Sequence, residues 1–204
     1  IVAFLVADGL VVYLRRRKAR AAAPAATPAH LAELLPEPDV PQGVFLAPSH
    51  LWVGLLPAGE ARIGLDALVQ SVLGPPDRVE GPVAGTAVRK GAPLFVARWG
   101  SRSVTFLSPL AGTVLETAEA GGTEGWVVRV DPEHAWADLH TFPMAEEARR
   151  WFSREWSRLR EFATGQAMPA PAMALPDGGS PAPGWLRHEP DATWNSFVDE
   201  FLKG

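Results

Sequence analysis

The fold is decided by the stretch at positions 93–117, which reads PLFVARWGSRSVTFLSPLAGTVLET. Short apolar runs are separated here by Gly and Pro, a pattern typical of strands joined by tight turns. Similar runs follow one another from Val44 to Pro132, so this part of the chain predicts a small β barrel or sandwich. One exception is Ile63 to Leu73, where apolar residues recur at helical spacing and indicate a single short helix.

The composition limits the class of protein. The chain has 204 residues, of which 47% are hydrophobic, enough for one domain of ordinary size with some additional segments. Twenty prolines and nineteen glycines favour turns and irregular connections over a helical bundle. There is no cysteine, which excludes disulfides, thiolate metal sites and cysteine nucleophiles.

The first residues predict a membrane anchor over positions 1–18. Positions 1–14 read IVAFLVADGLVVYL, and a basic cluster follows at once. This run is shorter than the roughly 20 residues that cross a bilayer, and because the chain opens on Ile we expect residues before it to complete the span. The alternative is a buried core helix. The cations expected to meet anionic lipid headgroups are Arg15, Arg16, Arg17, Lys18 and Arg20.

The order of apolar run and cations also predicts the topology. Positive charges after the run place the remainder of the chain in the cytoplasm, so we expect a single-pass protein of the bacterial inner membrane. Asp8 lies within the run, and a carboxyl group in lipid requires partners, which indicates neighbouring transmembrane helices. Without the five cations and Asp8, the chain keeps 14 basic and 22 acidic residues, a net charge of −8 that disfavours nucleic acid as a partner.

The remainder of the chain divides by composition. Positions 19–42 are rich in Ala and Pro and predict a tether, and positions 43–140 form the β domain. Positions 141–164 predict an amphipathic helix, and positions 165–204 an irregular Pro- and Gly-rich tail that ends in a short helix. The fold class expected is mainly β, with an N-terminal transmembrane helix, one short helix in the β domain and a C-terminal amphipathic helix.

Several motifs of the β domain resemble the glycine cleavage system H protein, a lipoyl-carrying member of the biotinyl/lipoyl domain superfamily. The resemblance implies a barrel-sandwich hybrid fold of the lipoyl type. The motifs occur in the family's order and are Ser49-His50-Leu51-Trp52-Val53, Ile63-Gly64-Leu65-Asp66-Ala67-Leu68, Gly85 with Val88-Arg89-Lys90-Gly91, Ser108-Pro109-Leu110-Ala111-Gly112-Thr113-Val114, and Gly125-Trp126-Val127-Val128-Arg129-Val130.

The sequence departs from this family at the position of its lipoylated lysine. In the family that lysine lies on a hairpin, eight residues before the proline of the serine-proline turn. Eight residues before Pro109 is Ser101, and there is no lysine between Gly91 and Pro132. A lipoyl amide needs a primary amine, so we expect no cofactor and no swinging-arm shuttle.

The hairpin and the C-terminal tail supply the residues expected to bind a partner. Arg98, Trp99 and Arg102 combine an aromatic ring with guanidinium groups, residue types enriched in protein interfaces. The alternative is that Trp99 belongs to the core and the arginines are solvated. The other residues expected to contact a partner are Asp8, Trp194, Phe197 and Phe201.

No constellation of residues predicts an active site or a metal site. His134 and His140 match no common metal spacing, and His50 is interpreted as a structural histidine because no nucleophile elbow accompanies it. We therefore expect a non-enzymatic accessory subunit that docks its β domain onto an integral membrane energy-conversion complex, respiratory or photosynthetic. The alternative is a carrier or partner-binding protein of lipoate-linked one-carbon metabolism. A small-molecule sensor is a third possibility, for which the sequence offers no polar cluster.

Overall fold

The computed structural model describes residues 35–118, 125–165 and 183–203. The predicted anchor at 1–18, with Asp8 and the five cations, lies outside these residues, as does most of the predicted tether. None of the helices within the described residues is long and apolar enough to cross a membrane. The chain divides into two compact units, one of positions 1–36 with 159–182 and the other of positions 37–158 with 183–204.

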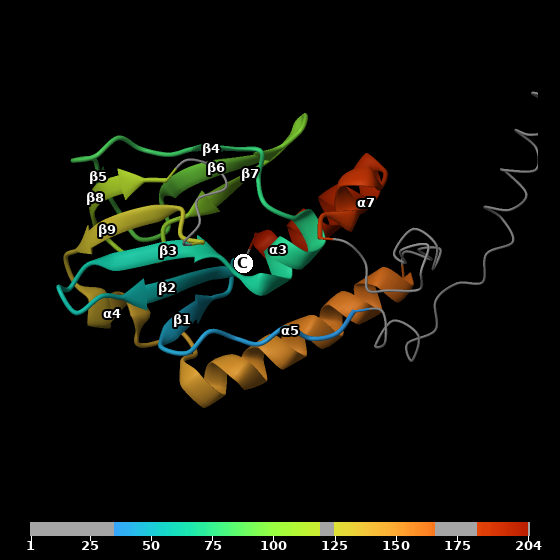
Figure 1. Cartoon of the computed structure of the whole chain (residues 1–204), viewed down its shortest axis with the longest axis horizontal. Helices are drawn as coiled ribbons and strands as arrows, with labels where there is room; N and C mark the ends of the chain where they lie inside the picture. Colours follow the sequence, from blue (N-terminus) through green and yellow to red (C-terminus); the bar gives the residue numbers. More distant parts are fainter. Residues whose placement is uncertain (1–34, 119–124, 166–182, 204) are drawn as a thin grey trace, which may run out of the picture. The chain divides into compact units, whose positions relative to one another are not determined.

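The second unit contains two antiparallel sheets, which Figure 1 shows as two layers. The larger sheet has the strand order β1-β2-β3-β9-β8-β5, and the smaller has the order β4-β6-β7. The strands of the larger sheet are β1 Val44–Ala47, β2 Leu51–Leu55, β3 Ala61–Leu65, β9 Val128–Pro132, β8 Gly112–Thr117 and β5 Ala87–Val88. Those of the smaller sheet are β4 Arg78–Glu80, β6 Pro93–Trp99 and β7 Arg102–Leu107.

The core is built from the alternating apolar residues of these strands. Along β7, Val104 and Phe106 are buried while the alternate residues Ser103, Thr105 and Leu107 are exposed, as expected for a strand with one face inward. Phe106 stacks on Phe95 of β6 with ring centroids 5.0 Å apart. The mainly β fold expected for this part of the chain is confirmed.

The short helix α3 Ala67–Leu73 follows β3 directly. The sequence pattern predicted a helix from Ile63, but Ile63 and Leu65 lie in β3. The helix begins later because the Asp66 carboxylate accepts hydrogen bonds from the backbone of Leu68 and Val69, which fixes Asp66 as the N-cap. The apolar face of α3 is fully buried.

The remaining helices follow the β domain. The amphipathic helix predicted from the sequence is α5 Ala145–Gly165, preceded by the short α4 Ala135–Leu139. The division between the two units falls within α5, and in the first unit Arg160 donates to the carbonyl of Leu35. The C-terminal segment of the second unit comprises a 3₁₀ turn η1 Trp185–His188, α7 Asp191–Phe197 and a π turn η2 Val198–Leu202. The sequence pattern predicted the last helix but not η1.

Candidate functional site

The hairpin of β6 and β7 ends in a two-residue turn. Trp99 pairs with Arg102, so Gly100 and Ser101 form the turn between them. Gly100 has a φ of 62°, whereas Ser101 does not have positive φ, the pattern of a type II′ turn that needs glycine at its first central position. The Gly100 N–H donates to Asp77 Oδ2 at 2.7 Å, which ties the turn to the chain before β4. Ser101 is exposed at the tip.

Trp99 anchors the base of this turn in the core. Its side chain is 3% exposed, and Nε1 donates to the carbonyl of Gly74 at 3.0 Å, just after the end of α3. Its ring lies edge-on to that of Trp194 in α7, with centroids 6.0 Å apart. The structure therefore places Trp99 in the core, in contact with the C-terminal segment.

Arg102 binds the C-terminal segment directly. Its guanidinium donates to three backbone carbonyls, those of Leu186, Arg187 and Glu189, with the shortest contact of 2.6 Å to Glu189. It also donates to Asp191 Oδ1 at 3.1 and 2.7 Å. The guanidinium lies 5.0 Å from the ring centroid of Trp194, a cation–π geometry. The guanidinium donors of Arg102 are thus taken up by acceptors within the chain.

Arg98 is the more exposed arginine of the hairpin. It forms a fork with Glu80 of the neighbouring strand, at 3.0 and 3.1 Å. This hydrogen bonding lowers the pKa of Glu80 and raises the pKa of Arg98, so both groups stay charged. With 42% of the Arg98 side chain exposed, the pair is a surface interaction.

The three C-terminal aromatic residues predicted to bind a partner are buried. Trp194 is 4% exposed, Phe197 0% and Phe201 2%. Phe197 stacks on Phe201 with centroids 5.1 Å apart. Of the predicted partner-binding set, Trp99 and Arg102 of the hairpin thus contact Trp194 of the C-terminal segment. Phe201 instead lies against the His50 ring, and Arg98 contacts Glu80. Asp8 lies outside the described residues.

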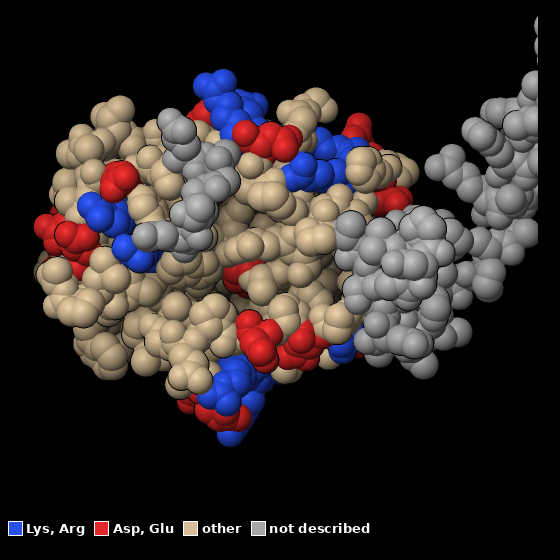
Figure 2. Space-filling model, viewed as in Figure 1, with Lys and Arg blue, Asp and Glu red and all other residues tan. Residues whose placement is uncertain are grey.

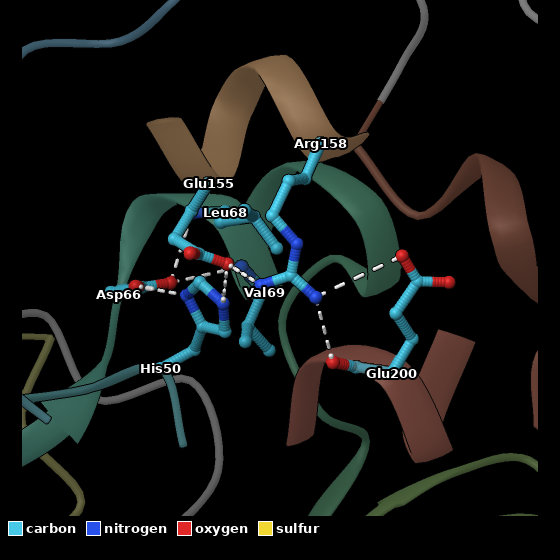
Figure 3. Close-up of polar contacts among 7 residues, drawn as sticks. All are labelled: His50, Asp66, Leu68, Val69, Glu155, Arg158 and Glu200. Carbon is cyan, nitrogen blue, oxygen red and sulfur yellow. Dashed lines mark hydrogen bonds and ion pairs between the residues drawn. The ribbon is translucent and has the colours of Figure 1, made fainter. Parts of the chain in front are cut away.

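A second cluster of charged groups lies between β1, α3, α5 and η2 (Figure 3). His50 stands at its centre, fully buried in the loop that joins β1 to β2. Its Nδ1 donates to Asp66 Oδ2 at 2.7 Å, and its Nε2 lies 3.8 Å from Glu155 Oε2. Arg158 continues the chain of charges, because it donates to Glu155 at 2.5 Å and to the carbonyl of Glu200 at 3.3 Å.

The carboxylates keep the His50 imidazole charged. Burial by itself would lower its pKa, but the charge of Asp66 and the hydrogen bond to it, with Glu155 on the other side, raise the pKa of His50 to about 9. The nearby His50 in turn lowers the pKa of Glu155. His50 also has a φ of 59°, uncommon for a residue other than glycine, so its side chain is turned inward at a cost in backbone energy.

His50 can hold charge but cannot reach a substrate, since it has no exposed surface. The interpretation of His50 as a structural histidine agrees with this geometry. Its partners Glu155, Arg158 and Glu200 were not recognised from the sequence, and only Asp66, placed before an apolar helical run, gave a signal. Among the described residues no group of three or more His, Asp or Glu side chains could hold a metal ion.

Comparison with known proteins identifies the family. Glycine cleavage system H protein 2 of Pseudomonas syringae pv. tomato is 30% identical over 111 residues, which cover 50% of this chain and 87% of that protein. The chain belongs to the glycine cleavage system H protein family. A probable H protein of Pyrococcus furiosus is 28% identical over 100 residues, 49% of this chain and 75% of that protein.

The assignment to the H protein family rests on these sequence relatives. No family model matches the chain. The crystal structure of an H protein from Mycobacterium marinum covers 56% of this chain and 99% of its own, with a TM-score of 0.45 and 18% identity. Within the H protein family, the resemblance places the lipoylated lysine at the hairpin turn, where this chain has Ser101.

Proposed function

We propose that this member of the H protein family is a non-enzymatic, single-pass membrane subunit that docks its H-like domain onto an integral membrane energy-conversion complex. The observation that carries the proposal is the hairpin turn. It has Ser101 where the resemblance predicts the lipoylated lysine, and the neighbouring Arg102 and Trp99 hold the chain's own C-terminal segment. A hairpin whose side chains hold another segment of the protein serves as a contact surface and does not carry an acyl group.

The lysines of the chain support the loss of carrier chemistry. The chain has only Lys18, Lys90 and Lys203, and Lys90 alone lies in the β domain. Lys90 stands on a different turn, where its Nζ donates to the carbonyl of Asp138 at 2.5 Å and lies 5.1 Å from the ring of Phe142. Its amine is therefore held against α4 and not presented on a hairpin tip.

The membrane part of the proposal is supported by the sequence. The apolar run and the five cations after it favour an anchor in the bacterial inner membrane with the H-like domain in the cytoplasm. Asp8 within this run favours a site between helices of a larger complex. A complex of the respiratory or photosynthetic type is proposed by analogy of topology.

Co-expression with a lipoate ligase is expected to leave the mass of the chain unchanged. Neither Ser101 nor Arg102 offers a primary amine, and the amine of Lys90 is held against α4. The intact mass after purification measures the outcome, with an H protein that carries the family's lysine as the positive control. Lys90→Arg is the matched control for attachment at an unexpected site.

An added lipoyl mass on the wild-type chain would contradict the proposal. If Lys90→Arg removed that mass, the attachment site would be Lys90. The chain would then fit the alternative function, a carrier in lipoate-linked one-carbon metabolism, which is favoured by the names of its two relatives.

Trp136 is the residue of the described surface best suited to contact the complex. All eight tryptophans lie among the described residues, and Trp136 in α4 is the one that is mostly exposed, at 76%. Exposed tryptophans are typical anchors of protein interfaces. Its position was not recognised from the sequence, where it is one tryptophan among several.

Trp136→Ala is expected to reduce the recovery of integral membrane proteins with the tagged chain at least several-fold, because interface tryptophans often contribute 2 kcal/mol or more to binding. Purification in mild detergent followed by identification of stoichiometric partners measures this. Thermal unfolding should change little, since the side chain is exposed. Val83→Ala, also at a residue with 78% exposure, is the matched control and should leave recovery unchanged. A wild-type chain that migrates alone as a monomer would overturn the docking proposal.

A further inference from the structure

A small apolar cavity opens between β1, β2, α3 and α5. Its volume is about 230 Å³, and its walls include Leu46, Trp52, Leu65 and Phe152. It corresponds to the hollow near the middle of the face in Figure 2, which has acidic side chains on its wall and along its lower rim. Apolar cavities of this size can hold a single aromatic ring or a short branched chain.

Trp52 can form the aromatic wall of the cavity because the residue paired with it on β3 is a glycine. Trp52 of β2 pairs with Gly64 of β3, and a Cβ atom at position 64 would lie 2.6 Å from the Trp52 indole. The glycine therefore allows the indole to lie against β3. The position of this wall is thus set by the pairing of the two strands.

The polar side chains that line the cavity differ in whether they already have hydrogen-bond or ion-pair partners. Asp66 is satisfied, because it accepts hydrogen bonds from the His50 ring and from two backbone N–H groups. Gln70 donates to the carbonyl of Leu65. Asp39, in contrast, is exposed and forms no ion pair among the described residues. Its carboxylate is the one charged group of the described lining that is left for a ligand.

The charged side chains of the lining and of the chain segment beside the mouth are acidic, and Arg149 lies with Val40 and Pro41 on a neighbouring hollow. Positions 37–43 carry Glu37 and Asp39 and no basic residue, and no described residue that lines the cavity is Lys or Arg. Glu37 accepts a hydrogen bond from Ser153 Oγ at 2.5 Å, so it stays beside the mouth. An apolar pocket with an acidic rim favours a ligand with an apolar body and a cationic head.

We infer that this cavity binds a small alkyl- or arylalkylammonium ion, with its apolar part against Trp52 and Phe152 and its ammonium group at Asp39. This site is separate from the hairpin interface and does not depend on the proposed docking function. Since a cavity of about 230 Å³ admits only a small ligand, we expect a dissociation constant on the order of 0.1–1 mM.

The test uses the full chain with 5-fluorotryptophan in place of tryptophan, and 2-phenylethylammonium as the probe. The ¹⁹F signal of Trp52, assigned from Trp52→Phe, reports occupancy of the cavity. We expect a saturable shift, with 2-phenylethylammonium binding about 3 to 10 times more tightly than the neutral 2-phenylethanol and phenylacetate binding most weakly. Ala67→Phe, which fills the cavity, should abolish the shift for all three.

Two variants isolate the rim charge. Asp39→Asn is expected to bring the ratio of ammonium to alcohol affinity to about 1, and Glu37→Gln, which changes an acid outside the lining, should preserve most of the preference. Equal binding of ammonium and alcohol to the wild-type chain would overturn the inference. A shift that survives Ala67→Phe, or the absence of any saturable shift, would overturn it as well.

Discussion

His50→Asn is expected to lower the free energy of unfolding by about 3–5 kcal/mol, the cost of breaking a buried ion pair by removing one partner. The substitution leaves the Asp66 and Glu155 carboxylates without their shared cation in a buried site. Asparagine is the variant of choice because it tolerates the left-handed backbone conformation of this position, where φ is 59°. The loss then reports the charge cluster and not backbone strain. Urea unfolding followed by tryptophan fluorescence measures it.

The same group predicts how stability depends on pH. The pKa of His50 is raised from 6.5 to about 9 in the folded chain, so the folded state binds its proton more tightly than the unfolded state. The stabilisation is fully present below pH 6.5 and is lost as the pH rises through 9. The shift corresponds to about 3 kcal/mol. Urea titrations between pH 6 and 10 should show this decrease for the wild-type chain and not for His50→Asn.

At acid pH the stability changes with pH in the opposite direction. Because His50 and Arg158 lower the pKa of Glu155, the contribution of Glu155 to stability is present above its ordinary pKa of 4.5 and is lost as the pH falls.

His188→Ala is the matched control for His50→Asn, since His188 is exposed. The stability of this variant should differ from that of the wild-type chain by less than about 0.5 kcal/mol at every pH. A similar loss in both histidine variants would contradict the role given to the buried cluster.

Local patterns explain which parts of this fold could be predicted. The alternation of apolar residues along β6 and β7 and the helical spacing within α5 are properties of neighbouring residues, so both elements were found from the sequence. The start of α3 was placed too early because Ile63 and Leu65 continue the helical spacing, while the Asp66 cap, which begins the helix, acts through its side chain. The spacing of apolar residues thus gave the type of element, and the Asp66 cap decided where the helix begins.

Long-range contacts explain what the sequence did not reveal. Arg102 and Asp191 are 89 residues apart, and nothing near either residue indicates that they meet. An arginine beside a tryptophan on a hairpin has the same local pattern whether it binds another protein or the chain's own C-terminus. Likewise, His50 could be interpreted as structural, but Glu155 and Glu200 enter its cluster only because α5 and η2 pack there.

Arg102→Ala is expected to release the C-terminal segment from the hairpin and to lower the free energy of unfolding by about 2–4 kcal/mol. The exposed carboxylate of Asp191 contributes little, because 84% of that side chain is in water. The larger loss comes from the three partly buried carbonyls of η1 and the residues after it, which lose their donor, and from the cation–π contact with Trp194. Arg102→Lys should recover little of it, since one ammonium group cannot reach all three carbonyls.

Arg98→Ala is the matched control on the same hairpin, one residue before Trp99. Its pair with Glu80 is about 40% exposed on both sides, so its loss should cost less than about 1 kcal/mol. Hydrogen exchange separates the two variants further. Amides of η1, α7 and η2 should exchange faster in Arg102→Ala than in the wild-type chain. In Arg98→Ala they should exchange at the wild-type rate. Equal destabilisation by the two variants, or unchanged protection of the segment in Arg102→Ala, would show that the apolar anchors Trp194, Phe197 and Phe201 hold it without the arginine.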